Sequence, residues 1–339
     1  MSLNPGVLTS WFEQYRSSLW GLSYRMTGSA ADADDIVQET FVRAYQHAPD
    51  GLDDPRRWLM RVAINAGRDV LRRRKRRRYV GPWLPTPIAT SDDVPAPEPI
   101  ADVRTQEGRY DLLESASLAF LQALEALTAS QRAVLLLRDV FDYSAAEVAA
   151  ALDLREGNVR TTHHRARRAM ESYERRRFVP NAINRARTDE TLRRFLSLLS
   201  AGDVRGIERM LAADVKAVTD GGGEFTASLR PITGIGRVGR FFARLAASRS
   251  GAIDASIRSI NQLPAAWFVF ESPCGRRPPR LVLSLDLNAA GLISDLRVIA
   301  SATKLARLDA VSGSRPAARS TATGATAGPV AWSTTRRSA

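Results

Sequence analysis

The stretch TASQRAVLLLRDVFDYSAAEVAAALDLREGNVRTTHHRARRAMESYERRR, residues 128–177, decides how the rest of the chain is interpreted. Capping-box patterns at Thr128 and Ser144 each precede an apolar-periodic run, which predicts two helix starts. A third helix follows a tight turn at Asp153, a residue that tolerates a positive φ better than most. The last two of these three predicted helices form a helix-turn-helix.

One face of the third predicted helix carries side chains that could read base edges or bind phosphates in a major groove. His163 falls on the inward-leaning side, so we predict a partly buried packing residue rather than a DNA contact. A solvated basic surface helix is the alternative, but the caps, the turn and the polar face agree with one another and favour DNA binding. The predicted contact residues are Asn158, Arg160, Thr161, His164, Arg165 and Arg168.

The composition of the 339-residue chain agrees with a polyanionic partner. Its net charge of +13 favours nucleic acid before a membrane. The single cysteine, Cys274, cannot form an internal disulfide. There is no apolar run long enough to span a bilayer, and the first residues lack the features of a signal peptide. We therefore expect a cytoplasmic protein of two or three domains, with no membrane partner, cofactor or metal.

The N-terminal residues predict two further helices. From Leu8 to Thr27 apolar residues recur at helical spacing, and Gly28 ends the run. Ser29 can cap the next helix, ADADDIVQETFVRAYQHA. This helix has an acidic outer face, which is unusual in a basic protein. Such a face is commonly just solvated, but the functional interpretation is a docking surface for a basic protein. Its residues are Asp34, Asp35, Gln38 and Glu39.

A third helix, PRRWLMRVAINAGRDVLRRRKRRR, is predicted from Pro55 with Asp54 as its N-cap. Apolar and basic residues separate onto two faces at the helical period. The helix ends in a cationic run of the kind that binds phosphates through counterion release. A solubilising tail is the alternative, but the run continues a basic amphipathic helix. The predicted DNA-contacting residues are Arg57, Arg61, Asn65, Arg68 and Arg72.

Residues 79–108 are rich in proline and acidic side chains, which excludes a helix or a central strand. We predict an extended linker between two helical DNA-binding modules, with Trp83 and Leu84 as apolar anchors.

Together these segments resemble a bacterial RNA polymerase sigma factor of the extracytoplasmic-function type, in the sigma-70 family, over roughly residues 8–177. DADDIVQETFVRAYQ is similar to the region 2 helix that grips the clamp coiled coil of the largest polymerase subunit. WLMRVAINAGRDVLRRRKRR resembles the segment that melts and reads the −10 element, and the resemblance implies a base pocket in the loop at residues 49–55. The helix-turn-helix resembles region 4, which reads the −35 element and touches the β-flap.

The resemblance implies region 2 over residues 1–78, the linker over 79–108 and region 4 over 109–178. Two residues depart from the family pattern. Arg155 stands where a small hydroxyl usually caps the recognition helix, and Asp153 replaces the usual turn glycine.

Beyond Pro180 the pattern changes to helices followed by strands in hairpin-like succession, which predicts an α+β domain with a curled antiparallel sheet. Over residues 185–305 it resembles the SnoaL-like, nuclear-transport-factor-2-like cone. We thus expect a multi-domain chain of two all-α sigma modules and an α+β SnoaL-like domain. Residues 311–339 are of low complexity and predicted to be disordered.

Some sigma factors of this type carry such a domain, and two of their motifs match here. One is Trp83-Leu84-Pro85 in the linker; the other is Asp220-Gly221-Gly222-Gly223, while the family's end motif is reduced to Lys304-Leu305. The resemblance implies that this domain regulates the sigma core in place of a separate anti-sigma protein.

The same fold also houses isomerases and cyclases, so a pocket enzyme is an alternative. All three histidines lie outside this domain and its spacing reveals no carboxylate pair, so we expect no catalytic residues. A small apolar ligand on Trp267, Phe268 and Phe270 is a stronger candidate, although strand alternation favours core packing.

The leading hypothesis is a sigma factor that binds polymerase core and promoter DNA. A helix-turn-helix regulator that acts without core polymerase is the rival within DNA binding. A pocket enzyme tethered to a DNA-binding module is the rival from another class.

Overall fold

The computed structural model describes residues 3–49, 51–76, 79–90, 109–247, 252–270 and 275–312. The chain divides into two compact units. Unit 1 contains Met1–Arg185 and Ser259–Leu263, and unit 2 contains Ala186–Arg258 and Pro264–Ala339. The chain therefore returns briefly to unit 1 between two strands of unit 2. Cys274 and the acidic residues of the predicted linker lie outside the described residues.

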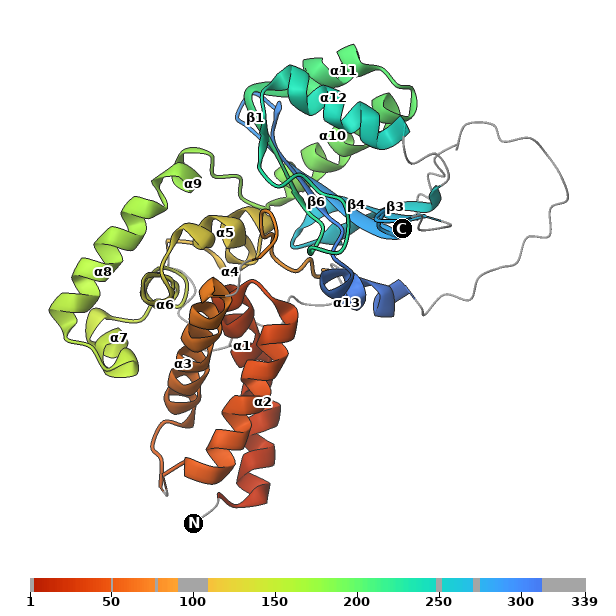
Figure 1. The fold of residues 1–339 in the computed structure, drawn as a ribbon. Helices are drawn as coiled ribbons and strands as arrows, with labels where there is room; N and C mark the ends of the chain where they lie inside the picture. Colours follow the sequence, from red (N-terminus) through yellow and green to blue (C-terminus); the bar gives the residue numbers. More distant parts are fainter. Residues whose placement is uncertain are drawn as a thin grey trace, which may run out of the picture. The chain divides into compact units, whose positions relative to one another are not determined.

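Unit 1 begins with a bundle of three helices, α1 (Pro5–Thr27), α2 (Ala30–His47) and α3 (Pro55–Arg76) (Figure 1). The predicted ends are confirmed. Gly28 closes α1 in the left-handed conformation, with a φ of 67°. Ser29 accepts a hydrogen bond from the amide of Asp32, and Asp54 accepts one of 2.9 Å from the amide of Arg57. These caps set where each helix starts, so they also set which residues face outward.

The second helical module of unit 1 contains the helix-turn-helix. Both capping boxes are present, at Thr128 with Gln131 and at Ser144 with Glu147. Asp153 adopts the predicted left-handed turn with a φ of 53°, and Arg155 makes no side-chain cap. The elements are α4 (Leu112–Ser115), α5 (Leu118–Ala123), the 3₁₀ helix η1 (Leu124–Ala126), α6 (Ala129–Asp139), α7 (Ala145–Leu152), α8 (Glu156–Ala169) and α9 (Glu171–Arg175).

A single hydrophobic core runs through both helical modules of unit 1. Buried Arg25 of α1 donates to the Ser115 hydroxyl and to the Leu112 carbonyl oxygen, both at 2.8 Å. Across a second contact, buried Arg132 of α6 donates to the Met26 carbonyl oxygen at 3.0 Å. Polar links between apolar surfaces fix one alignment of the surfaces, because a buried donor loses water and needs its acceptor.

The described part of the linker, residues 79–90, is extended and largely buried within unit 1. Leu84 is fully buried, which confirms one of the two predicted anchors. Trp83 is half-buried, and its ring packs so closely on Gly28 that a Cβ there would come within 2.6 Å of it. The Thr86 amide donates to the Gly28 carbonyl oxygen at 2.8 Å. The linker therefore starts as part of the first helical module.

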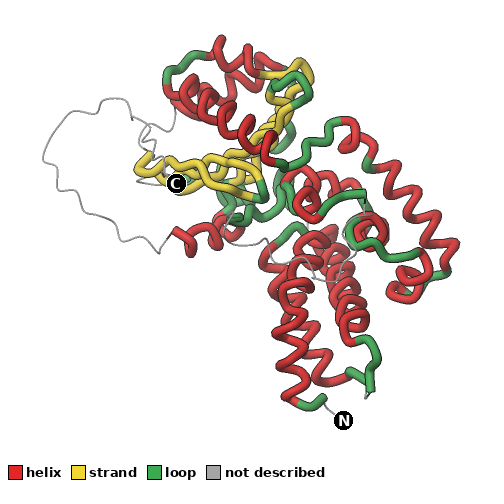
Figure 2. Tube along the Cα trace, turned by 180° about the vertical axis from the view of Figure 1, so that it is seen from behind, coloured by secondary structure: helices red, strands yellow, loops and turns green. Residues whose placement is uncertain are grey.

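Unit 2 combines a mixed sheet with helices α10 (Ala182–Ser200), α11 (Val204–Met210) and α12 (Ile235–Ala247), which gather on one face of the sheet in both views (Figures 1 and 2). The aromatic rings of Phe195 and Phe242 meet edge-to-face at 5.5 Å between these helices. The strands are β1 (Leu211–Asp220), β2 (Ile232–Thr233), β3 (Ala252–Ile260), β4 (Leu263–Phe270), β5 (Arg280–Leu287) and β6 (Ile293–Ile299), in the order β2-β1-β6-β5-β4-β3.

Two expectations for unit 2 need correction. The sheet is not wholly antiparallel, because β1 pairs in parallel with β6. Helix α13 (Ala302–Ser312) includes the first two residues of the predicted disordered tail. Its apolar residues Leu305 and Leu308 are buried, which explains why the helix continues. The rest of that tail lies outside the described residues.

Candidate nucleic-acid interface

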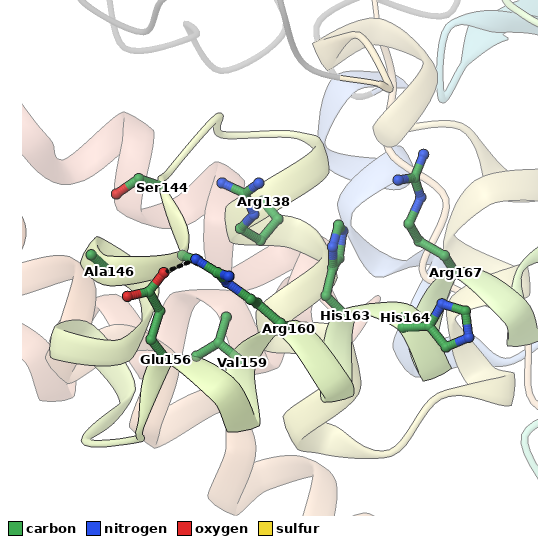
Figure 3. A pocket seen from close by; sticks show the side chains of 10 residues that line it. Arg138, Ser144, Ala146, Glu156, Val159, Arg160, His163, His164 and Arg167 are labelled. Carbon is green, nitrogen blue, oxygen red and sulfur yellow. Dashed lines mark hydrogen bonds and ion pairs between the residues drawn. The ribbon is translucent and has the colours of Figure 1, made fainter.

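Helix α8 presents all six of the residues predicted to contact the −35 element on its exposed side. Its other side is held by Val159 and Ala166, which are fully buried against the rest of the module. Arg160 pairs with Glu156 one turn earlier at 2.6 Å, so part of its charge is compensated (Figure 3). An exposed pair of this kind contributes little to stability and does not prevent Arg160 from reaching a phosphate.

His163 lies on the inner side of α8, as predicted. Its Nε2 is 2.8 Å from Oδ1 of the buried Asp139 side chain, and the imidazole is only 15% exposed. Arg167 approaches the other oxygen of Asp139 at 3.9 Å. The histidine therefore links α8 to α6 and helps to fix the rotation of α8 about its axis.

An open cavity of about 600 Å³ adjoins this contact (Figure 3). Arg138, Arg160 and Arg167 line it, together with the first residues of α7. Sequence reasoning missed Arg138 and Arg167. Arg167 flanks the predicted polar face, and helical spacing could have included it; Arg138 belongs to α6, which no periodicity in α8 could have indicated.

The predicted −10 face of α3 is only partly open. Arg57, Arg61 and Arg72 are exposed, whereas Asn65 and Arg68 are half-buried. The Arg68 guanidinium donates to Asn65 at 3.0 Å and to the Ser130 hydroxyl of α6 at 3.3 Å. Burial lowers the pKa of Arg68 below its usual value. Thus α6 covers the middle of the basic face.

This α3–α6 interface is fastened by two arginines that share one carboxylate. Arg74 donates to Glu125 at 3.1 Å and to the Thr27 carbonyl oxygen at 2.7 Å. Arg132, which is 2% exposed, donates to Glu125 at 2.7 Å. Because the acceptors come from both helical modules, the contact holds α3 and α6 in one arrangement.

The outer face of α2 combines acidic and apolar side chains. Asp35 and Gln38 are exposed, and Asp34 accepts a hydrogen bond of 2.8 Å from the Trp20 indole. Sequence reasoning missed Val42 and Tyr45, which are 48% and 42% exposed. They follow Gln38 at i+4 and i+7, so they share its face. The sequence could have indicated them, because they are two apolar residues outside the apolar face that α2 buries. Glu39, the fourth predicted residue, pairs with Arg43 at 2.5 Å.

Comparisons with known proteins agree with this arrangement of modules. The family models for sigma-70 region 2 and sigma-70 region 4 match residues 11–77 and 117–170. Over 237 residues the chain is 35% identical to the ECF RNA polymerase sigma factor SigJ of Mycobacterium tuberculosis, covering 69% of this chain and 72% of that protein. The chain belongs to the ECF RNA polymerase sigma factors.

Two further relatives extend the comparison. ECF RNA polymerase sigma factor SigG of Mycobacterium tuberculosis is 32% identical over 232 residues, with 62% of this chain and 60% of that protein covered. The crystal structure of Mycobacterium tuberculosis SigJ superposes with a TM-score of 0.67 at 28% identity, over 88% of this chain and 98% of that one. The two helical sigma modules and the following mixed-sheet domain are therefore an architecture that this sigma factor shares with SigJ.

The turn Ser259–Leu263 of this sigma factor belongs to unit 1, although it joins β3 to β4. Its Asn261 is 1% exposed and has a φ of 49°. The side-chain amide donates to the Tyr24 hydroxyl at 2.7 Å and to the Ala116 carbonyl oxygen at 2.8 Å. Its oxygen accepts from the Ile88 amide at 2.9 Å. A single buried side chain therefore links region 2, the linker and the start of region 4.

The linker and this turn also pair through their backbones. The Asn261 amide donates to the Ile88 carbonyl oxygen at 3.0 Å, and the Thr90 amide donates to the Ser259 carbonyl oxygen at 2.9 Å. Ala89 and Ile260 form an antiparallel bridge. The described end of the linker is thus held as a short strand.

The two predicted regulatory motifs have different surroundings. Trp83, Leu84 and Pro85 lie in unit 1, as described above. The glycine motif lies in unit 2, where Asp220 accepts a 2.6 Å hydrogen bond from Lys304, so it meets the reduced end motif. Gly222 and Gly223 have φ values of 66° and 78°. A Cβ on Gly222 would lie 2.5 Å from the Ser301 hydroxyl, so the turn requires glycine for conformation and for space.

The aromatic residues proposed to hold an apolar ligand are not brought together. Trp267 is buried, with Arg258 over its ring at 5.2 Å. Phe268 and Phe270 stack at 6.2 Å on the opposite face of β4, because neighbouring strand residues alternate. The prediction that these three residues together line one ligand site is therefore wrong.

The pairing of β5 with β6 brings two carboxylates together, although their spacing along the chain did not indicate this. Asp286 and Asp295 are cross-strand partners in β5 and β6. Asp286 is nevertheless engaged by Arg297 at 2.7 Å, and burial raises its pKa above the usual range. The described residues contain no cluster of metal-binding side chains. Within the described part of the chain no helix is long and apolar enough to cross a membrane.

Proposed function

We propose that this sigma factor directs core RNA polymerase to a restricted set of promoters, with α2 binding the clamp of the largest subunit, α3 melting and reading the −10 element, and α8 reading the −35 element. The observation that carries the proposal is the coexistence, in one unit, of an acidic and apolar α2 face with two separate basic helices. A protein that only binds DNA would not need the acidic and apolar face of α2.

The α2 face has the composition of a protein-binding surface. Exposed Val42 and Tyr45 provide an apolar centre, and Asp35 and Glu39 provide an acidic margin. Interfaces combine an apolar centre with a polar rim, and charge complementarity speeds encounter with a basic partner. The clamp coiled coil is the proposed partner of this face. Region 4 is proposed to touch the β-flap.

The α8 face has the composition of a major-groove reader. Asn158 and Thr161 would contact base edges, while Arg165 and Arg168 would bind phosphates. Arg138 and Arg167 extend this set through the cavity beside α7. The first turn of α7 offers amides that favour an anion at the same place. The base pocket proposed for residues 49–55 adjoins the start of α3.

Run-off transcription with purified core polymerase tests the proposal. Asp35→Lys should lower promoter-specific transcript at least about tenfold, since it reverses a charge at the proposed clamp surface. Glu13→Lys is the matched control, because Glu13 is an exposed acid of α1 outside that face, and it should stay within about twofold. Promoter-duplex binding by the free protein should be equal in both. No transcript from the unaltered protein, together with tight duplex binding, would instead support a regulator that acts without polymerase.

We also infer that the C-terminal domain regulates the sigma core through the turn Ser259–Leu263, and that it has no catalytic role. A fully satisfied buried polar network specifies one arrangement of the segments it joins. Asn261 makes such a network with three segments of the sigma core. While the network is intact, the described end of the linker stays bound to α1 and to the start of the second helical module.

The substitution Asn261→Asp tests this role. It removes both donors and places a carboxylate against the Ala116 carbonyl oxygen. Hydrogen exchange of residues 84–90 should rise at least about tenfold, because each lost buried hydrogen bond costs about 1 kcal/mol or more. Transcript yield should rise with it. Asn288→Asp is the control, since the Asn288 oxygen only accepts hydrogen bonds and aspartate keeps that function. A freed linker with unchanged transcription would refute the regulatory role.

A further inference from the structure

We propose that unit 1 contains a binding site for a polyphosphate chain, from a nucleoside triphosphate or from inorganic polyphosphate, in the cavity between the end of α3, the linker and the start of α6. The cavity holds about 630 Å³. Its walls include Arg72, Arg74, Lys75, Trp83, Ser130 and Arg132. The site deepens the proposed regulation of the sigma core. It shares Arg72 with the proposed −10 face of α3 and is separate from the surfaces proposed for polymerase and for the −35 element.

The cavity has an excess of positive charge. Arg72, Arg74, Lys75 and Arg132 contribute four cations, and among the described lining residues Glu125 contributes the one carboxylate. Arg72 also pairs with Asp69, which does not line the cavity, at 3.3 Å, so the excess is about two positive charges. Arg74 and Arg132 share that carboxylate. Cations crowded at a half-enclosed site attract a multivalent anion more strongly than separate surface charges do.

Arg132 is the buried cation of this cavity. Its side chain is 2% exposed, and its Nε has no hydrogen-bond partner among the described residues. Burial, with the nearby charge of Arg74, lowers the pKa of Arg132 despite its pairing with Glu125. An anion in the cavity would favour the charged form and relieve this cost.

The start of α6 adds directed donors. The capping box satisfies the Gln131 amide through the Thr128 hydroxyl. The amides of Ala129 and Ser130 belong to the same first turn, where the helix provides no internal acceptor, and both residues line the cavity. A helix of 11 residues directs its positive end at this point. Phosphate oxygens are the ligands that such a turn prefers.

The aromatic residues allow the two sources of a polyphosphate chain to be distinguished. Trp83 is fixed under the Arg74 guanidinium, 4.0 Å from the ring centre, and so forms a rigid wall. Tyr79 also lines the cavity and is 36% exposed, so a base held beside the cations would contact its ring. A nucleotide would use both the cations and Tyr79, whereas inorganic polyphosphate would use the cations alone.

A ligand at this site would stabilise the arrangement in which α6 covers α3. The anion would contact α3 through Arg72 and Lys75, and α6 through its first turn. A ligand that bridges two modules binds their packed form more tightly than their separated form and shifts the population toward it. Cellular polyphosphate would then restrain transcription by this sigma factor.

Isothermal titration of the full-length protein with tripolyphosphate, at fixed salt, tests the site. One equivalent should bind, and Arg72→Ala/Lys75→Ala should weaken binding at least about tenfold, because each charge-assisted contact is worth a severalfold change. Arg237→Ala/Arg244→Ala removes two exposed arginines of α12 and is the charge-matched control. Its affinity should stay within about twofold. Equal weakening in both variants, or several equivalents bound, would show non-specific attraction and overturn the proposal.

Two further readouts complete the test. ATP binding tighter than tripolyphosphate, with the difference abolished by Tyr79→Ala, would assign the site to nucleotides; equal affinities would assign it to the inorganic chain. Tripolyphosphate should also slow hydrogen exchange at residues 127–130. Protection of α8 instead would show that the anion only mimics DNA and would overturn the site. Neither assay contains polymerase, so their failure leaves the transcription proposal to its own test.

Discussion

Helices α3 and α8 were predicted from the same kind of pattern, yet the structure treats them differently. All six predicted residues of α8 are exposed, whereas Asn65 and Arg68 of α3 are half-buried against α6. The two helices differ in what lies beside them. Only the apolar side of α8 is covered, while α3 is also covered on its basic side. In this arrangement the proposed −35 face of α8 is fully exposed, whereas the proposed −10 face of α3 is only partly exposed.

The largest effect is expected from breaking the α3–α6 interface at Arg132. Arg132→Ala removes hydrogen bonds to two carbonyl oxygens and to Glu125, and it leaves buried acceptors without partners. The free energy of unfolding should fall by about 3–5 kcal/mol, measured by urea denaturation. The exposed Arg165→Ala should change it by less than about 0.5 kcal/mol. Equal effects would show that α3 is no more constrained than α8.

A smaller effect should come from the linker contact that closes the first module. Gly28→Ala forces a side chain into a φ of 67° and against Trp83, 2.6 Å away. Gly51→Ala is the control, because its φ is 68° and a Cβ there would meet nothing within 4 Å. We expect a loss of about 1 kcal/mol at Gly51 and about 2–3 kcal/mol at Gly28. Thermal unfolding of the two variants would measure the difference, and equal losses would contradict the importance of the Trp83 contact.

The third effect depends on pH, through Tyr24. Burial raises the pKa of Tyr24 above its ordinary value, and its hydroxyl donates to the Thr86 carbonyl oxygen at 2.6 Å. Above about pH 10 the unfolded chain therefore loses this proton while the folded chain keeps it, so stability falls as pH rises. The slope for one group is about 1.4 kcal/mol per pH unit.

Denaturation of the unaltered protein and of Tyr24→Phe between neutral and alkaline pH isolates this slope. The unaltered protein should be more stable at neutral pH, and its advantage should shrink as the pH rises. Burial lowers the pKa of neighbouring Arg25 to about 10, but Arg25 is present in both proteins and largely cancels in the difference. A constant difference would show that Tyr24 is not held as the buried donor between linker and bundle.

Much of the fold followed from local chemistry in the sequence. Capping boxes at Thr128 and Ser144, the turn at Asp153 and the stop at Gly28 all depend on a few adjacent residues, so they could be predicted. The inward position of His163 followed from helical period alone. These features need no knowledge of distant partners.

The features that escaped prediction depend on contacts distant in the sequence. The burial of Arg68 depends on Ser130, and the arrangement of the linker depends on Asn261, far along the chain. The parallel pairing of β1 with β6 likewise needs the sheet to be assembled. Helical period shows which residues share a face, but it cannot show which neighbouring element covers that face.

The smallest effect on stability is expected from replacing one exposed arginine on each of the two helices. These two substitutions also compare the helices most directly. Arg168→Ala on α8 and Arg72→Ala on α3 each remove an exposed cation, so both should change the free energy of unfolding by less than about 0.5 kcal/mol. Duplex binding by the free protein should differ, because α8 exposes all its predicted contact residues, whereas exposed Arg72 of α3 adjoins the half-buried Asn65 and Arg68. Arg168→Ala should reduce the slope of log affinity against log salt by about 1, since one phosphate contact is lost. Arg72→Ala should leave that slope nearly unchanged until Asn261→Asp releases the linker. If Arg72→Ala lowers the slope as much as Arg168→Ala without that release, then α3 already binds DNA in the packed form, and the coverage by α6 does not restrain the −10 face.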